Sequence, residues 1–343
     1  MSLVSVLLPV HNGTRYLESA ARSILNQTHR DLELLVLDDG STDGSGEMAQ
    51  ALGDSRIRVM RSERNRGLPA TLNRGLAVAQ GEIVARQDAD DLSHPRRLEH
   101  QVRFLEENPS VGLVGTQAWV IDERGRCLGA VQHACEHESL VWELLFDNAF
   151  AHTSVAFRRD LVAKTHGGYD PAWPYNQDYE LWVRLAGTTR LANLPERLVA
   201  WRSHPTSMTV SMKNEAATAN RRLMARNLPS VVGALSEEHL ELVAQAREGM
   251  GVGELKRLLP LLDIWSTIYR GSVTPGAMED FRRTMARLYL GLAFARRGRT
   301  PARAALALWA GRQFGSELAR ALLGATTMRA RLLLDSELMA GFH

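Results

Sequence analysis

The sequence predicts an α/β fold with a largely parallel sheet, helices on both of its faces, and a helical region after it. Short apolar runs rich in β-branched residues alternate with helical patterns through the first part of the chain. Acid-rich turns follow two of these runs. Beyond about residue 215, Ala, Leu and Arg dominate and strand patterns end, so we expect two domains, at 1–210 and 211–343.

The strand predictions rest on short apolar runs, and the helix predictions rest on apolar residues spaced three or four positions apart. The first run ends at Pro9, the turn sequence DDGSTDGSG closes the second, and Asn108-Pro109 ends the third helix. In chain order, strands are expected at 3–8, 32–37, 57–60, 83–86, 111–121, 153–158 and 198–202, and helices at 14–27, 68–79, 96–108, 140–146 and 178–186.

The bulk composition is that of an ordinary globular protein. The chain has 343 residues, 45% hydrophobic and 23% charged, and a formal net charge of +2, which argues against a nucleic-acid partner. Its two cysteines, Cys127 and Cys135, form no CxxC and suit a reducing compartment. No basic leader and no apolar run of about 18 residues is present, so we expect a cytoplasmic protein.

Charge is unevenly distributed near the C-terminus. Residues 281–332 contain eleven arginines and one acid, Glu317. One interpretation is a solvated helical face. The other is a peripheral contact with anionic lipids at the inner face of a membrane, with Trp309 among the arginines. The sequence leaves both open.

The most informative stretch follows the strand expected at 83–86, where Asp88, Asp90 and Asp91 crowd together. Like charges this close oppose one another's ionisation, so the cluster is either a well-solvated loop or a cation site. In extended chain Asp88 and Asp90 point the same way and Ala89 the other. Because Mg²⁺ and Mn²⁺ prefer oxygen ligands and share their shell with phosphates, we expect one of these cations here.

Parallel strands bring their carboxyl ends to one edge of a sheet, where ligands of open α/β folds bind. Three segments should therefore meet: Pro9-Val10-His11-Asn12, Asp38-Asp39-Gly40-Ser41 and the acid cluster. This composition suits a nucleotide, since Asp39 can accept the N–H of a uracil ring and small residues allow the backbone to approach a sugar.

Several segments in order resemble one known family: SVLLPVHN, SILNQTHRDLELLVLDDGSTDGS, NRGLPATLNRGLAVAQGEIVARQDADD, SHPRRLEHQ, HTSVAFRRDLV and YNQDYELWVRL. Together they resemble the family 2 inverting glycosyltransferases with a GT-A (nucleotide-diphospho-sugar transferase) fold, over roughly residues 2–205. The resemblance implies a mostly parallel GT-A sheet flanked by helices.

The resemblance also implies roles for particular residues. The nucleotide would contact Pro9, Val10, Asp39 and Arg66, the D-x-D motif would be Asp88-Ala89-Asp90, the divalent cation would be held by Asp90 with Asp88 and His204, and the catalytic base would be Asp178. The family commonly has Glu before the base, where this chain has Gln177. The Q-x-x-R-W motif of the processive branch is absent, so a single-addition enzyme is expected.

The expected function is that of a metal-dependent hexosyltransferase that moves a sugar, most simply from a UDP-sugar, to a hydroxyl of a glycan, lipid-linked or small-molecule acceptor. Such products belong to cell-surface polysaccharides or glycoconjugates. A sugar nucleotidyltransferase is the nearest alternative, although HNGTRYLES lacks the glycine-rich basic loop it would need. A glycoside hydrolase has no need of this D-x-D. A catalytically silent nucleotide-sugar-binding subunit is the third alternative.

Overall fold

The computed structural model describes residues 2–164 and 167–229, with scattered positions between 236 and 278. These residues belong to two compact units. The first contains 2–133 and 150–216, and the second contains 134–149 and the described residues from 217 onward. The sheet and every residue named above for the nucleotide, the cation and the base belong to the first unit.

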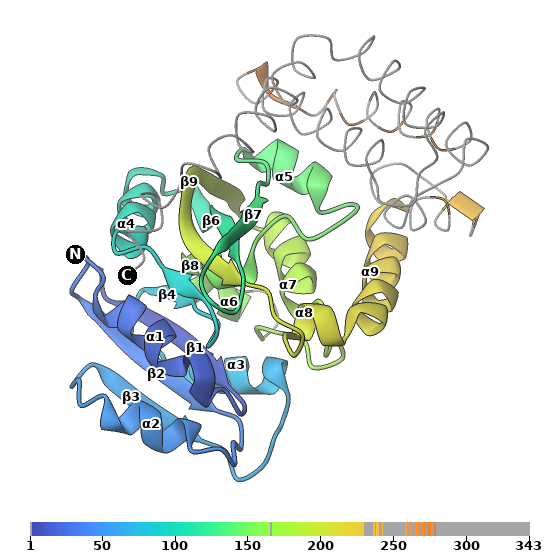
Figure 1. Cartoon of the computed structure of the whole chain (residues 1–343). Coiled ribbons are helices and arrows are strands. Elements are labelled where there is room, and N and C mark those ends of the chain that lie inside the picture. Colours follow the sequence, from blue (N-terminus) through green and yellow to red (C-terminus); the bar gives the residue numbers. More distant parts are fainter. Residues whose placement is uncertain are drawn as a thin grey trace. The chain divides into compact units, whose positions relative to one another are not determined.

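The first four long strands form the parallel part of the sheet, drawn in blue and cyan in Figure 1. β1 (Val4–Val10) pairs in parallel with β2 (Leu32–Asp38) and with β4 (Ile83–Arg86), and β3 (Ile57–Arg61) extends the sheet beyond β2. β1 and β2 are buried along their whole length. Continuous apolar runs are typical of parallel strands covered on both faces.

The sheet continues beyond β4 with mixed directions. β8 (Ala156–Arg158) is antiparallel to β4, and β6 (Val111–Ile121) is antiparallel to β8. β9 (Arg190–Arg202) is parallel to β6, β5 (Leu92–Ser93) is antiparallel to β9, and β7 (Cys127–Val131) is antiparallel to β6. The described part of the chain thus has a nine-stranded sheet in the order β3-β2-β1-β4-β8-β6-β9-β5, with β7 beside β6. The predicted α/β class is confirmed, in a mixed sheet whose parallel pairs lie among β1 to β4 and between β6 and β9.

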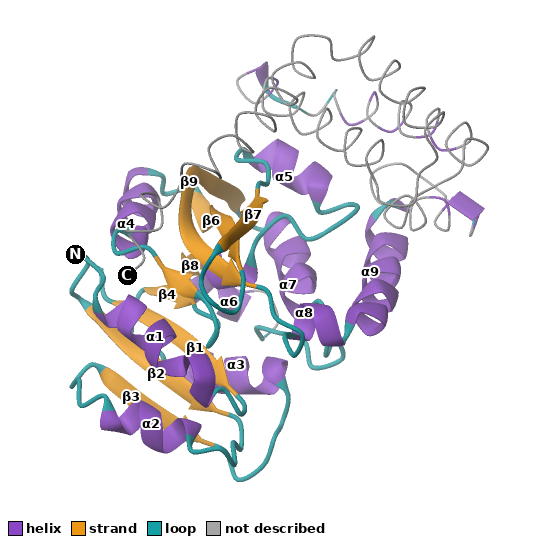
Figure 2. Ribbon diagram, in the orientation of Figure 1, coloured by secondary structure: helices purple, strands orange, loops and turns teal. Residues whose placement is uncertain are grey.

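Helices cover both faces of the parallel strands (Figure 2). Alternate residues of β1, such as Val6 and Leu8, join a buried cluster with apolar residues of α1 (Thr14–Leu25) and α4 (Arg97–Glu107). The intervening Leu7 faces α3 (Leu68–Val78), where a Cβ on Gly75 would lie 3.0 Å from its Cδ2. Glycine at that position lets α3 lie close against the sheet.

Several boundaries differ from those predicted. The strand expected at 153–158 is a 3₁₀ turn, η1 (His152–Ser154), followed by the short β8, because Ser154 bonds back to the Ala151 carbonyl through both its N–H and its hydroxyl, each at 2.8 Å. The strand expected at 198–202 begins at Arg190. The remaining helices of the described residues are α2 (Ser45–Ala51), α5 (His137–Glu143), α6 (Arg159–Lys164), α7 (Gln177–Ala186), α8 (Met208–Ser211) and α9 (Lys213–Asn227).

The second unit has its own aromatic cluster. The ring of Trp142 lies 5.0 Å from that of Tyr269, whose hydroxyl donates to the Glu138 carbonyl at 2.6 Å. Phe146 stacks on Trp265 at 6.4 Å. The basic stretch 281–332 lies outside the described residues, so its membrane interpretation stays a prediction. None of the helices that the structure describes has the length and apolarity required to cross a bilayer.

Candidate active site

The carboxyl ends of β1, β2 and β4 meet at one edge of the sheet, as predicted. Val10 lies opposite Asp38 in the pairing of β1 with β2, and Leu7 lies opposite Arg86 in the pairing of β1 with β4. The residues that follow each strand are therefore neighbours. This edge holds the loop after β1, the acidic turn after β2 and the acid cluster after β4.

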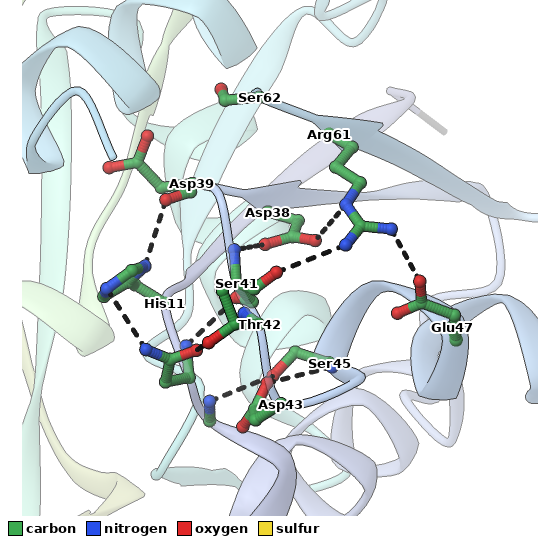
Figure 3. Close-up of polar contacts among 12 residues, drawn as sticks. His11, Asp38, Asp39, Ser41, Thr42, Asp43, Ser45, Glu47, Arg61 and Ser62 are labelled. Atoms are coloured by element: carbon green, nitrogen blue, oxygen red, sulfur yellow. Dashed lines mark hydrogen bonds and ion pairs between the residues drawn. The ribbon is translucent and has the colours of Figure 1, made fainter. Parts of the chain in front are cut away.

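The turn after β2 is held by Asp38, which is fully buried. Its Oδ1 accepts the Ser41 N–H at 2.8 Å, and the Nε atom of Arg61 lies 3.5 Å from its Oδ2 (Figure 3). A Cβ on Gly46 would come within 2.6 Å of the same oxygen. Asp38 therefore shapes the turn from inside.

Asp39 fastens the loop that follows β3. Its two carboxylate oxygens accept the backbone N–H groups of Arg66 at 2.9 Å and Gly67 at 3.0 Å, which places Arg66 beside Asp39. Its carbonyl oxygen lies 3.0 Å from Nδ1 of His11 (Figure 3). A carboxylate has about four acceptor positions, so Asp39 can still accept a further N–H from a ligand. Sequence reasoning predicted the ligand contact but not this backbone clamp.

Small apolar residues of the loops after β1 and β4 lie close together. A Cβ on Gly13 would lie 2.7 Å from Val10 Cγ2 and 3.8 Å from Ala89 Cβ, so Val10, Gly13 and Ala89 are brought together. Pro9 is buried within β1, opposite Leu37 of β2. Val10 is buried, Gly13 and Ala89 are half-buried, and Pro9 contributes to the strand below them.

The acid cluster is tied to three other segments. Arg86 is 1% exposed and donates through Nη2 to Asp88 Oδ1 at 2.6 Å, and the Asp88 N–H donates to Thr153 Oγ1 at 3.1 Å. Asp90 Oδ2 lies 2.9 Å from Nε2 of His204. Burial and the nearby charge of Asp88 raise the pKa of Asp90, and the His204 contact opposes that rise. A cation bound beside Asp90 would favour its ionised form and so offset the effects of burial and of the Asp88 charge.

Asp91 is fully buried and joins the cluster to β9. Its Oδ1 accepts the Arg202 N–H at 2.7 Å, while Arg202 Nε donates to the Asp90 carbonyl at 2.8 Å. Burial, followed by the charges of Asp90 and Asp88, raises the pKa of Asp91 well above its usual range. These two bonds position the end of β9, and with it His204.

Asp90 Oδ2 and His204 Nε2 lie at hydrogen-bond distance, 2.9 Å. A carboxylate oxygen and an imidazole nitrogen are both ligand types for divalent cations, so the two side chains could share a cation in place of the proton between them. Within the described residues no group of three or more His, Cys, Asp or Glu side chains could hold a metal ion together. Any further ligands would come from water or from a bound phosphate, which is how Mg²⁺ is usually held at nucleotide sites.

Asp178 lies in the first turn of α7, after Asn176 in a left-handed conformation (φ 56°). A helix N-terminus favours a charged carboxylate. Its side chain is 12% exposed, and its Oδ2 lies 4.0 Å from Nδ1 of His152. Burial raises the pKa of the nearby Tyr169; the charge of Arg86 opposes this rise, and those of Asp178 and Asp88 add to it.

The structure thus brings together Val10, Asp39, Arg66 and Ala89 on the nucleotide side, and Asp88, Asp90 and His204 at the cluster. Sequence reasoning missed the residues that hold these groups: Arg86, Thr153, Arg202, His152 and Tyr169. Only Arg86 gave a signal, as a charged residue ending an apolar strand.

Comparison with known proteins agrees with this geometry. The chain matches the family described as Glycosyl transferase family 2 over residues 5–164. It is 31% identical over 215 residues to the O-antigen biosynthesis glycosyltransferase WbnJ of Escherichia coli, an alignment that covers 60% of this chain and 81% of WbnJ. The chain belongs to glycosyl transferase family 2.

Other known proteins are similar over shorter or more distant alignments. The Bacillus subtilis protein EpsE is 43% identical over 187 residues, covering 53% of this chain and 66% of EpsE. The crystal structure of S. aureus TarS 1–349 in complex with UDP superimposes with a TM-score of 0.53 at 17% identity, covering 92% of this chain and 89% of that chain. At that identity the likeness establishes the fold, which is GT-A as predicted.

Proposed function

We propose that this chain moves a sugar from a UDP-sugar to an acceptor hydroxyl, one sugar at a time and with inversion. The observation that carries the proposal is the 2.9 Å contact between Asp90 Oδ2 and His204 Nε2 at the carboxyl edge of the parallel strands. An acid and a histidine from distant elements meet there within a cluster of like charges. Folding alone does not require such an arrangement.

The proposed donor is a UDP-sugar. Crystal structures of S. aureus TarS contain UDP and UDP-GlcNAc, and TarS shares the fold of this chain. Uracil presents one imide N–H, which the spare acceptor positions of Asp39 suit. Beside it, Val10 and Ala89 let the nucleotide sugar approach the backbone. These features support a UDP-sugar as the donor.

The proposed cofactor is Mn²⁺ or Mg²⁺, held by Asp90 and His204 with water and the donor diphosphate as its further ligands. Asp88, the third ligand expected from the sequence, does not join Asp90 and His204 in a three-residue metal site, and its Oδ1 accepts from Arg86 instead. When bound, such a cation neutralises charge on the departing diphosphate and orients it. Arg86 keeps Asp88 in place from the buried side, at 2.6 Å.

The proposed base is Asp178. It takes the proton of the acceptor hydroxyl as that oxygen attacks the anomeric carbon, on the face opposite the departing diphosphate. The bond from the anomeric carbon to the phosphate oxygen breaks in the same displacement. One displacement without a covalent sugar–enzyme intermediate inverts the configuration. The helix N-terminus of α7 favours the ionised form that this role requires.

The acceptor is proposed to belong to a cell-surface polysaccharide or glycoconjugate. WbnJ, 31% identical to this chain, is named for O-antigen biosynthesis. A hexose as the transferred sugar and a single addition per acceptor complete the proposal. Both follow from the resemblance described above, including the missing Q-x-x-R-W motif.

A screen of UDP-, GDP- and dTDP-sugars tests the proposal. Ligand at about 100 times its Kd stabilises a protein by roughly 2.7 kcal/mol, so the right donor should raise the melting temperature, and only with Mn²⁺ or Mg²⁺ present. The stabilising donor is then incubated with candidate acceptors, and the anomeric configuration of the product is read by NMR. Stabilisation without transfer or donor hydrolysis would indicate a silent binding subunit. A retained configuration would contradict inversion.

A further inference from the structure

Asp178, the base proposed above, lies one helical turn from a group of packed aromatic side chains. Asp178 and Trp182 are four residues apart, so they lie on the same face of this helix. Trp182 is fully buried, and the rings of His152, Phe157 and Tyr169 surround it at 6.1, 6.2 and 6.4 Å. Packing against Trp182 therefore fixes the imidazole and the phenol beside the carboxylate.

His152 lies between Tyr169 and Asp178. Its Nε2 is 3.1 Å from the Tyr169 hydroxyl, and its Nδ1 is 4.0 Å from Asp178 Oδ2. Burial, aided by the charge of Arg86, keeps the pKa of His152 well below its usual value. Burial also raises the pKa of Tyr169. At neutral pH the imidazole is uncharged and the phenol keeps its proton.

A neutral imidazole has one N–H and one acceptor nitrogen. The Tyr169 hydroxyl can donate to Nε2, which leaves the proton on Nδ1, the nitrogen that faces Asp178. The other tautomer would direct a lone pair at the carboxylate. Tyr169 and Asp178 therefore favour the same tautomer of His152.

Tyr169 is itself held firmly. Asn73 of α3 bonds both of its backbone groups, accepting its N–H at 2.8 Å and donating to its carbonyl at 2.7 Å. Arg184 Nη2 donates to the Gly168 carbonyl at 2.5 Å and pairs with Glu180 at 2.8 Å. Two helices thus fix the segment that carries the phenol.

We infer that His152 is a positioning residue for Asp178. The Nδ1–H of His152 orients the Asp178 carboxylate and keeps it ionised, while Tyr169 fixes the tautomer of His152. The inference rests on the proposed role of Asp178 as the base. The 4.0 Å separation exceeds a hydrogen bond of about 2.9 Å by roughly 1 Å. Catalytic hydrogen bonds are often long before substrate binds and shorten in the complex.

Other charges act on the same groups. Arg86 at the end of β4 influences both His152 and Tyr169, and Asp88 influences Tyr169. Glu180 and Arg184 of α7 form an ion pair of their own. The test leaves these four residues unchanged, so that any shift in the pH profile reports on His152.

The test compares His152→Gln, His152→Asn and Tyr169→Phe in the full chain. The side-chain nitrogen of Asn can occupy the place of Nδ1, whereas that of Gln corresponds to Nε2. We expect His152→Gln to lower kcat by roughly 10²-fold, as a misplaced catalytic group does. Donor KM should change little, and the acid limb of the kcat–pH profile should move to higher pH. His152→Asn should recover much of the rate, and Tyr169→Phe should show a smaller shift in the same direction.

Two remote substitutions control for lost packing: His29→Gln, at a buried histidine bonded to backbone carbonyls, and Tyr269→Phe in the second unit. Equal effects of Asn and Gln at position 152, or an unmoved acid limb in all three variants, would overturn the inference. If His152→Gln does not fold, the acid limb of the Tyr169→Phe variant decides the question, because this substitution removes only the hydroxyl and keeps the aromatic ring. An unmodified chain without transferase activity, or an Asp178→Asn variant with full activity, would instead overturn the proposed function.

Discussion

Asp90 and His204 are 114 positions apart in the sequence, yet their side chains approach to 2.9 Å. The approach is built by Arg202, which bonds Asp91 through its backbone N–H and the Asp90 carbonyl through its side chain. The pairing of β5 with β9 brings Leu92, next to the cluster, opposite Ala200. The pairing of β5 with β9 therefore places His204 beside the acid cluster.

This relationship predicts how the cation site responds to mutation. Asp90→Asn should abolish transfer and leave the fold intact, because Asp90 lies in a loop outside the apolar core. His204→Gln should keep activity but raise the Mn²⁺ concentration for half-maximal rate by at least about tenfold, as loss of a metal-site partner commonly does. Mn²⁺ titrations of the rate measure both effects.

EDTA should stop transfer by the unmodified chain, and added Mn²⁺ or Mg²⁺ should restore it. The remote His29→Gln variant serves as the control for a lost histidine and should keep the normal Mn²⁺ response. Full activity of Asp90→Asn, or activity that persists in EDTA, would remove the cation from the proposed site.

Two glycines with similar conformations allow the Asp39 clamp to be tested. Gly40 (φ +76°) and Gly53 (φ +68°) are both left-handed, but a Cβ on Gly40 would lie 2.6 to 2.8 Å from the backbone of Arg64 and Asn65, whereas nothing lies within 4 Å at Gly53. Gly53→Ala should cost about 1–2 kcal/mol of unfolding free energy, the price of the conformation alone. Gly40→Ala should cost roughly 1–3 kcal/mol more, because backbone must move.

Urea unfolding measures the difference between these two variants. Gly40→Ala should also bind UDP more weakly, since the displaced loop contains the Arg66 and Gly67 N–H groups that Asp39 holds. Equal costs for the two substitutions, with unchanged UDP affinity, would show that the loop adapts and that the clamp is unimportant.

The parallel half of the sheet was predictable from sequence because its signal is local. β1 and β2 are covered on both faces, so their residues form unbroken apolar runs. β7 gave no such signal, since none of its residues is buried: Leu128 is exposed and the other four are half-buried. The first half of β9, with Pro195 and Glu196, is a strand because β6 pairs with it, and no local pattern reveals a partner about 80 residues away.

The same distinction applies to the site. Asp88, Asp90 and Asp178 carry charge at strand ends or a helix start, where the residue type itself indicates chemistry. Thr153 and Arg202 act through contacts to Asp88, Asp90 and Asp91 that exist only once the sheet has formed. Asp39 combines a predictable and an unpredictable feature. Its position at the nucleotide edge follows from the strand order, whereas its hydrogen bond with the Gly67 N–H forms only in the folded chain.

Asp43 should make stability depend on pH in acid. Burial opposes the shift, but hydrogen bonds from Ser45 and Thr14 lower the pKa of Asp43 to about 2. Its unfolded pKa is about 3.9, so the lowered folded value stabilises the native state above pH 4, and this contribution is lost as pH falls toward 2. Asp43→Asn should therefore be less stable than the unmodified chain at pH 7, by at most about 1 kcal/mol because water screens an exposed group.

Urea unfolding at a series of pH values measures this effect. The stability difference between Asp43→Asn and the unmodified chain should shrink between pH 4 and the lowest pH at which both remain folded. Glu63→Gln, on an exposed turn, is the control for removing a surface carboxylate. A difference that stays constant with pH would mean that the contacts of Asp43 to Thr14 and Ser45 do not depend on its charge.

Asp178→Asn separates binding from chemistry. The amide has nearly the shape of the carboxylate but cannot accept the proton of the acceptor hydroxyl. A general base typically contributes on the order of 10² to 10⁴ in rate, so kcat should fall by that factor. Affinity for the UDP-sugar should stay within a few-fold, because the proposed donor contacts lie on Asp39, Val10 and the acid cluster. Calorimetric donor titration and single-turnover transfer measure the two quantities on the same protein. Lost donor binding with an undiminished rate at saturation would make Asp178 a donor-binding group and leave the base to another residue.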